Sequence, residues 1–198
     1  MNEALPVTLS PSRTVPNGVT LTRFALAGVV AWLLYVQAHQ ELAGILLVVA
    51  SLTDWLDGYL ARRLGQASLF GSLFDMLADQ ALFGSSLLLA MRAHLFAKAA
   101  GFIPWNPYLY AVPALAGGVA VLVGIATYLW KRRTQAIEFP TPTKVAKLNF
   151  WFWLAPLILA VLDLGPGWLL AALMYASIVS TIATFYSYLK KGGYVFTR

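Results

Sequence analysis

Four carboxylates lie close together in a chain that has few of them. The sequence holds eight Asp and Glu residues, and four of these are Asp54, Asp57, Asp75 and Asp79. Spacings of three and four residues place each pair on one face of a helix. Oxygen ligands without His or Cys suit Mg²⁺, Mn²⁺ or Ca²⁺. Because such ions keep coordination positions open for substrate oxygens, the pattern favours a metal site that binds phosphate groups.

Small and basic residues accompany the acids. Gly58, Ala61 and Gly71 leave room for a ligand or a neighbouring helix to approach the backbone. Arg62 carries a planar guanidinium that can bind a phosphate oxygen. The alternatives are that the small residues only pack helices together and that Arg62 is an ordinary basic anchor at the membrane surface.

The composition of the whole chain points to a membrane. Of its 198 residues 60% are apolar and 11% are charged, whereas a soluble domain is about 45–50% apolar and about 25% charged. The net charge of +6 is better explained by membrane orientation than by nucleic acid, which we do not expect as a partner. The absence of Cys excludes disulfides and thiolate metal sites.

The elements that must position the acids are apolar runs of membrane-spanning length. About 20 apolar residues in a helix cross the hydrocarbon core, and a helix satisfies its own backbone hydrogen bonds there. We therefore predict an all-α polytopic membrane protein with six transmembrane helices in residues 17–191, between a segment 1–16 and a tail 192–198. The predicted spans cover residues 19–38, 41–61, 69–91, 108–130, 145–162 and 168–189.

The basic residues predict the orientation of these spans. Of the 14 Lys and Arg residues, only Arg92 and Lys98 fall on the side of the membrane opposite the termini. Positive charge collects on the cytoplasmic side, so we expect both termini in the cytoplasm and the protein in the cell's inner (plasma) membrane. The 62–68 turn makes the second and third spans antiparallel neighbours, whose four aspartates can meet at the cytoplasmic boundary. An Asp at mid-membrane costs about 2.5–3.5 kcal/mol, so bound cations are expected there.

The spacing of these residues resembles the signature of the CDP-alcohol phosphatidyltransferase family. It reads Asp54-x2-Asp57-Gly58-x2-Ala61-Arg62-x8-Gly71-x3-Asp75-x3-Asp79, and all eight signature positions match.

The resemblance implies a reaction, a set of cofactors and a set of partners. A phosphatidyl group would pass from CDP-diacylglycerol to an alcohol with release of CMP, at a site that faces the cytoplasm. Two ions, Mg²⁺ or Mn²⁺, would be held by Asp54, Asp57, Asp75 and Asp79, and Asp79 would also be the general base. The family also implies a homodimer among membrane lipids. Nucleotide and phosphate would be bound by Gly58, Ala61, Arg62 and Gly71.

The entry to the first span resembles a subset of this family. Residues 15–23 are similar to the PN-x-LT-x-x-R segment of phosphatidylglycerophosphate synthases and related cardiolipin synthases. The resemblance implies that Asn17, Thr20 and Arg23 approach the nucleotide or its phosphates. The alternative is that Asn17 only starts the helix and that Arg23 is an interface anchor.

A second basic group suggests the acceptor. Arg132 and Arg133 end the fourth span, and Lys144 and Lys147 open the fifth. They form a candidate pocket for an anionic acceptor, with glycerol 3-phosphate first and phosphatidylglycerol second; anchoring beside anionic lipid is the alternative. The chain departs from the synthase pattern in having Gln80 after the last aspartate and Phe150 in place of Thr.

Two other functions compete with the transferase. A divalent-cation transporter would use the same acids as a translocation site, but it would distribute acids over more helices and deeper in the membrane. A catalytically silent family member would bind only lipid or a protein partner. The complete signature, including the residue expected to act as a base, favours the enzyme.

Overall fold

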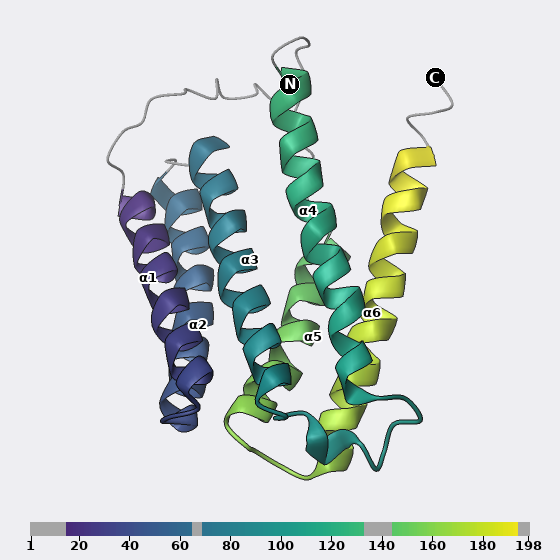
Figure 1. The fold of residues 1–198 in the computed structure, drawn as a ribbon. Helices are drawn as coiled ribbons and strands as arrows, with labels where there is room; N and C mark the ends of the chain where they lie inside the picture. Colours follow the sequence, from purple (N-terminus) through teal and green to yellow (C-terminus); the bar gives the residue numbers. More distant parts are fainter. Residues whose placement is uncertain (1–14, 65–68, 133–143, 194–198) are drawn as a thin grey trace. The chain divides into compact units, whose positions relative to one another are not determined.

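All regular secondary structure in the described part of the chain is helical. The computed structural model describes the backbone of residues 15–64, 69–132 and 144–193, and the side chains of residues 21–53, 73–130, 145 and 148–187. Within these ranges there are six α-helices and two short 3₁₀ helices. Figure 1 labels the six α-helices and colours the chain in sequence order. The elements are α1 Val15–Val36, α2 Gln40–Leu64, α3 Leu69–Arg92, η1 Ala97–Ala99, η2 Pro107–Tyr110, α4 Ala111–Arg132, α5 Lys144–Val161 and α6 Gly167–Gly193.

The predicted all-α class is confirmed, with two differences in the boundaries. The expected turn at 62–68 begins later, because α2 continues to Leu64. The fourth predicted span begins with η2, where the side chain of Asn106 accepts a hydrogen bond from the backbone N–H of Tyr108 at 3.0 Å and Pro107 follows the cap. Proline suits the first turn because it has no N–H to satisfy there.

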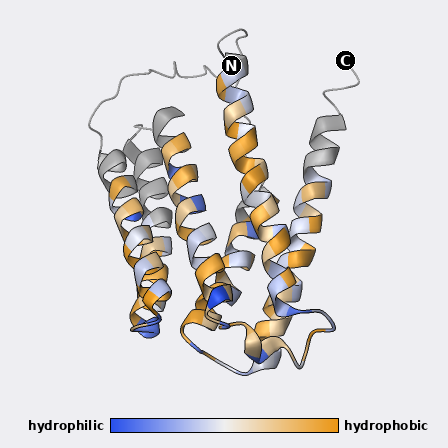
Figure 2. Cartoon of the chain, viewed as in Figure 1, coloured by the Kyte–Doolittle hydropathy of each residue, from blue (hydrophilic) through white to orange (hydrophobic). Residues whose placement is uncertain are grey.

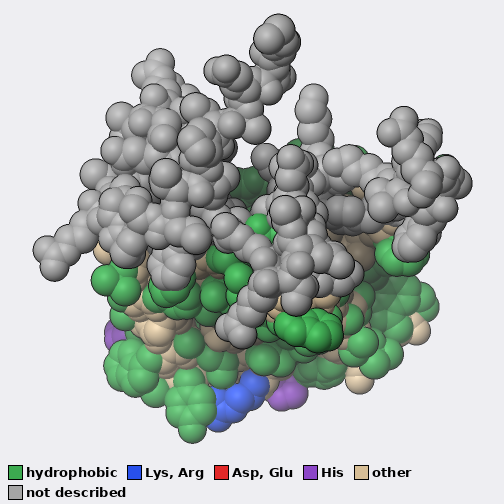
Figure 3. All heavy atoms as spheres, turned by 90° about the horizontal axis from the view of Figure 1, so that it is seen from above, with side chains coloured by type: hydrophobic (Ala, Val, Ile, Leu, Met, Phe, Trp, Pro, Cys, Tyr) green, Lys and Arg blue, Asp and Glu red, His purple; other side chains and the backbone are tan. Residues whose placement is uncertain are grey.

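Three described segments are long and apolar enough to cross a membrane. They are Leu73–Arg92, Pro107–Trp130 and Gly167–Ser187, and shorter apolar helices occur at Leu21–Val36, Gln40–Thr53 and Leu148–Val161. Hydrophobic residues dominate these helices in Figure 2 and most of the described surface visible in Figure 3. Large apolar side chains such as Trp32, Val179 and Phe185 are exposed, as expected for helices that face lipid.

The chain divides into two compact units, Met1–Ser86 and Leu87–Arg198. In the first unit α1 packs along α2. Ala27 of α1 and Ala43 and Ala50 of α2 are buried. Small buried residues allow helix backbones to approach closely in a membrane, where van der Waals packing and not water exclusion drives association. The buried side chains of α3 in this unit are Leu73, Ala78, Leu82, Phe83 and Ser86.

In the second unit α5 packs along α6, and polar side chains connect them. The indole N–H of Trp153 donates to Thr181 Oγ1 at 2.8 Å, and the Thr181 hydroxyl also lies 3.2 Å from Asn149 Oδ1. The Tyr110 hydroxyl is 2.7 Å from Ser177 Oγ in the buried interior. Interhelical hydrogen bonds of this kind help to fix helix pairing in an apolar environment.

Several helices end in a left-handed residue that is not glycine. Gln37 follows α1 with φ of 53°, His94 follows α3 with φ of 59°, and Asp163 follows α5 with φ of 54°. After α3 the Leu95 N–H donates to the Ala90 carbonyl at 3.0 Å, which is the hydrogen bond that closes a helix in this way. These ends direct the chain into its turns without glycine.

Candidate functional site

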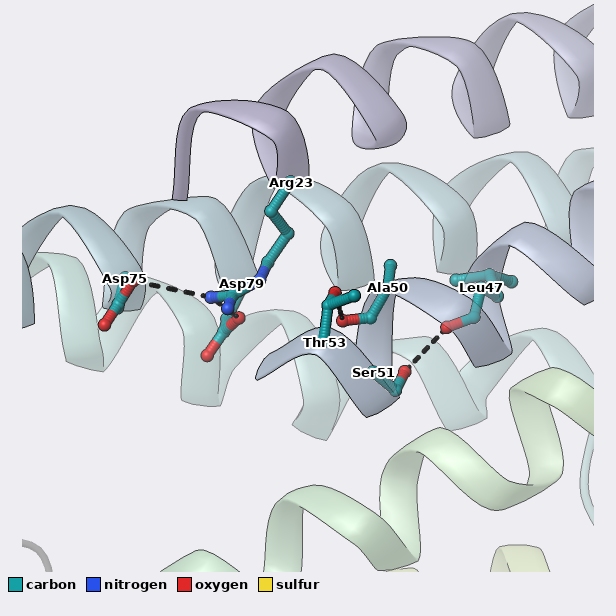
Figure 4. Close-up of polar contacts among 7 residues, drawn as sticks. All are labelled: Arg23, Leu47, Ala50, Ser51, Thr53, Asp75 and Asp79. Carbon is teal, nitrogen blue, oxygen red and sulfur yellow. Dashed lines mark hydrogen bonds and ion pairs between the residues drawn. The ribbon is translucent and has the colours of Figure 1, made fainter. Parts of the chain in front are cut away.

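The described centre of the site is a cluster of one Arg and two Asp side chains. Asp75 and Asp79 lie one turn apart on α3, and Arg23 reaches them from α1. Arg23 Nη1 donates to Asp79 Oδ1 at 3.1 Å, and the same nitrogen lies 3.6 Å from Asp75 Oδ1 (Figure 4). One guanidinium nitrogen therefore bridges two carboxylates of consecutive helical turns.

The exposures of the three side chains differ sharply. The Arg23 side chain is 1% exposed, while those of Asp79 and Asp75 are 26% and 36% exposed. A buried guanidinium needs ionic partners, and a charged hydrogen bond to a carboxylate is about twice as strong as a neutral one. The guanidinium thus lies at the buried side of the cluster, and the two carboxylates keep accessible surface for other ligands.

An aromatic contact beside the cluster also joins α1 and α3. The ring of Phe24 meets the ring of Phe74 edge to face, with 5.7 Å between centroids. Phe24 follows Arg23 in the chain and Phe74 precedes Asp75, so this contact lies at the level where the guanidinium meets the acids. Edge-to-face aromatic pairs contribute about 0.5–1.5 kcal/mol beyond the area they bury.

The end of α2 that leads to the other two acids is helical. Ser51 Oγ donates to the Leu47 carbonyl at 2.7 Å, and Thr53 Oγ1 donates to the Ala50 carbonyl at the same distance (Figure 4). These hydroxyls are thereby satisfied within their own helix, as an apolar environment requires.

The remaining predicted ligands of metal and nucleotide have no described side chain. The backbones of α1, α2 and α3 include them, so the helical spacing expected for the acid pairs agrees with the structure. That all four carboxylates converge remains a prediction. The residues concerned are Asn17, Thr20, Asp54, Asp57, Gly58, Ala61, Arg62 and Gly71.

The predicted acceptor residues also lie at the edge of the described chain. Arg132 is the last residue of α4, Lys144 is the first of α5, and Lys147 lies one turn further on; their side chains are not described. Arg133 falls outside the described residues. Asn149 is the described neighbour of this group, and its Oδ1 is held by the Thr181 hydroxyl of α6.

The donor chemistry of the described acids fits a hard divalent cation. Asp75 and Asp79 offer only carboxylate oxygens, which Mg²⁺ and Mn²⁺ prefer. Mg²⁺ is often bound by one or two carboxylates together with waters and substrate phosphates. The described side chains contain no group of three or more His, Cys, Asp or Glu residues that could hold a metal. Asp54 and Asp57 of the signature are the expected additional ligands.

Sequence reasoning assigned Arg23 to the nucleotide and did not foresee its contact with the acids. A signal was present, because an Arg within an apolar helix needs an acidic partner. The sequence offers few acids, and Asp75 and Asp79 are expected on the same membrane side as Arg23. What sequence alone could not supply was the contact of Arg23 with α3, which brings it to these two acids.

Comparison with known proteins decides the family. The model of the CDP-alcohol phosphatidyltransferase family matches residues 13–186. The chain belongs to this family. The match includes α1, α2 and α3, with the cluster of Arg23, Asp75 and Asp79, and extends into α6.

Relatives within the CDP-alcohol phosphatidyltransferase family carry two kinds of name. The chain is 27% identical over 187 residues to CDP-diacylglycerol–glycerol-3-phosphate 3-phosphatidyltransferase 1, chloroplastic/mitochondrial, of Arabidopsis thaliana, with 90% of this chain and 62% of that protein covered. It is 37% identical over 82 residues to the enzyme of the same reaction name from Pseudomonas fluorescens, covering 40% of this chain and 42% of that one. A candidate cardiolipin synthase of Mycobacterium bovis is 29% identical over 156 residues, covering 78% of this chain and 68% of the relative.

The coverage limits what these names say about the present chain. The alignments include 62% of the Arabidopsis relative and less than half of the Pseudomonas relative. Family membership is therefore established, whereas the reaction and the acceptor are inferred from the site.

Proposed function

We propose that this protein transfers a phosphatidyl group from CDP-diacylglycerol to an alcohol and releases CMP, as a step of phospholipid biosynthesis. The observation that supports this most directly is the pairing of Asp75 and Asp79, the last two signature carboxylates, on one accessible face of α3. The family match over residues 13–186 supports a role for this pair in phosphatidyl transfer.

In this proposal Asp79 is the general base. Its carboxylate takes the proton of the acceptor hydroxyl, and the acceptor oxygen forms a bond to the phosphorus that carries diacylglycerol. The bond from that phosphorus to the bridging oxygen breaks, and CMP leaves with the electron pair. A positioned base contributes about 10²–10⁴-fold to such a step. The accessible surface of Asp79 supports its contact with a substrate.

The proposed cofactors are two Mg²⁺ or Mn²⁺ ions. Asp54, Asp57, Asp75 and Asp79 would hold them, and the carboxylate-only donor set of the described pair is compatible with either ion. When bound, such ions neutralise the charge that develops on the diphosphate. Gly58, Ala61, Arg62 and Gly71, with Asn17 and Thr20, are proposed to surround the cytidine and phosphates.

Glycerol 3-phosphate is the leading acceptor and phosphatidylglycerol the second. Both carry a hydroxyl that can accept the phosphatidyl group and a phosphate that basic side chains can bind. The names of the Arabidopsis and Pseudomonas relatives support the first, and that of the Mycobacterium bovis relative supports the second. The proposed acceptor residues are Arg132, Arg133, Lys144 and Lys147.

The proposed setting is the inner membrane, with six spans and both termini in the cytoplasm. Three described segments have the length and hydropathy of a span, and shorter apolar segments lie in the other three helices. The distribution of basic residues supports a cytoplasmic position for the acidic end of the helices. A homodimer is proposed from the family.

The test uses purified full-length protein with labelled CDP-diacylglycerol and Mg²⁺ or Mn²⁺. Glycerol 3-phosphate, phosphatidylglycerol and an uncharged polyol are offered separately. Release of CMP that depends on one acceptor identifies the reaction, and no release with any acceptor contradicts the proposal.

Variant Asp79→Asn separates catalysis from binding in that assay. We expect turnover to fall by about 10²–10⁴-fold while CDP binding is retained, because the amide cannot accept the proton. Undiminished turnover would remove Asp79 as the base. The transporter alternative is tested by loading vesicles that contain the protein with a metal-sensitive dye: metal entry without CMP release would favour it.

A further inference from the structure

The described part of the site contains a buried cation that has no role in the reaction proposed above. Arg23 lies in the apolar helix α1 and is 1% exposed. Its guanidinium faces the proposed general base. A side chain that binds the phosphates of a diffusing substrate has to present its N–H groups to the substrate pocket, and this one presents Nη1 to Asp79 and Asp75.

We propose, on the basis of the function proposed above, that Arg23 is a positioning residue that orients the carboxylate of Asp79 for proton removal. Its Nη1 holds Asp79 Oδ1 by a hydrogen bond of 3.1 Å. Rotation about the Cβ–Cγ bond of an Asp is broad when nothing holds it. Fixing Oδ1 restricts that rotation, so that the second oxygen keeps one direction for the acceptor hydroxyl.

The bridge to Asp75 adds a second constraint. The same Nη1 lies 3.6 Å from Asp75 Oδ1, so one buried group sets the separation of the two carboxylates. Arg suits this role better than Lys, because its guanidinium remains charged in an apolar environment and its planar fork has fixed directions. The positive charge also reduces the repulsion between the two acids.

A second contact joins α1 and α3 at the level of Arg23. Phe24 and Phe74, adjacent in sequence to Arg23 and Asp75, meet edge to face at 5.7 Å. On the α1 side, Ala27 and Val30 are buried one and two turns further along. The guanidinium is therefore carried by a stretch of α1 that is packed along α2, which supports a positioning role.

The experiment compares Arg23→Gln, Arg23→Lys, Asp79→Asn and the double variant Arg23→Gln/Asp79→Asn. For each, kcat and KM for CDP-diacylglycerol, the Kd for CDP and the thermal unfolding midpoint are measured. We expect Arg23→Gln to lower kcat by about 10–100-fold, the usual effect of removing a partner that orients a site ligand. KM and the Kd for CDP should stay close to the wild type, and Arg23→Lys should recover part of kcat.

The double variant shows whether Arg23 acts through Asp79. In the Asp79→Asn background the part of the effect that Arg23 exerts through the Asp79 carboxylate is already lost, so Arg23→Gln should cause a much smaller loss there than in the wild type. A purely structural role would lower both backgrounds by the same factor. Lys98→Gln is the matched control: it also removes one positive charge, but from an exposed ion pair with Asp163, and its kcat should equal that of the wild type.

The outcomes separate this inference from the proposed function. Arg23 is a phosphate ligand instead if Arg23→Gln raises KM and the Kd for CDP while kcat is kept. The positioning role is also overturned if the kcat of the double variant falls by the product of the two single-variant factors. If Arg23→Gln does not fold, the kcat and Kd of Arg23→Lys decide in the same way. A wild type that releases no CMP contradicts the proposed function, and this inference with it.

Discussion

The start of α6 offers a sharp test of the packing in the second unit, because Gly167 lies directly against the backbone of η1. A Cβ atom at position 167 would lie 2.1 Å from the carbonyl oxygen of Lys98 and 3.1 Å from Cε2 of Phe102. Carbon and carbonyl oxygen atoms in close weak contact stay about 3.3–3.6 Å apart, so the two backbones must separate by about 1.2 Å in Gly167→Ala.

The expected cost of that displacement is large for a single methyl group. Overpacking costs about 1–3 kcal/mol, and we expect the upper end because the obstructing atom belongs to the backbone and has no rotamer to change. For a chain of this size 1 kcal/mol corresponds to about 2–4 °C, so 3 kcal/mol lowers the unfolding midpoint by about 6–12 °C. The assay is thermal unfolding of the purified protein in detergent, followed by intrinsic tryptophan fluorescence.

Gly124→Ala is the matched control within the same unit. A Cβ at Gly124 of α4 would have no neighbour within 4 Å, and Ala favours a helix over Gly by about 1 kcal/mol. Its midpoint should therefore be equal to that of the wild type or slightly higher. Equal midpoints for Gly167→Ala and Gly124→Ala would refute the close approach of α6 to η1.

Three further outcomes are expected. Removing divalent cations with EDTA should abolish CMP release, and adding Mg²⁺ or Mn²⁺ should restore it; full activity in EDTA contradicts the proposed cofactors. Tyr110→Phe should destabilise the protein by about 1 kcal/mol, measured as a lower thermal midpoint, because it removes the buried hydrogen bond to Ser177. Lys98→Gln should leave the midpoint nearly unchanged, since the ion pair with Asp163 is exposed; a loss as large as that of Tyr110→Phe would show that it is more than a surface contact.

The sequence determined the helices because their signals are local. A run of apolar residues about 20 long must hydrogen-bond within itself in a membrane, so length and composition predict a helix without knowledge of its neighbours. The boundaries were less predictable: α2 extends to Leu64, into the residues expected to form the turn, and η2 precedes α4. Capping by Asn106 and the continuation of α2 through Arg62 depend on hydrogen bonds, which cannot be predicted from hydropathy.

The family and the candidate acids also follow from the sequence, because the signature depends on residue types at fixed spacing on two helices. Which groups touch each other was decided by tertiary structure. Arg23 and Asp79 are 56 positions apart, and the fit of Gly167 against Lys98 depends equally on distant segments. Such contacts arise from how helices pack, where small residues and aromatic edges set the distance and the level. The sequence shows which reactive groups are present, but only the packing of the helices sets the direction in which each one points.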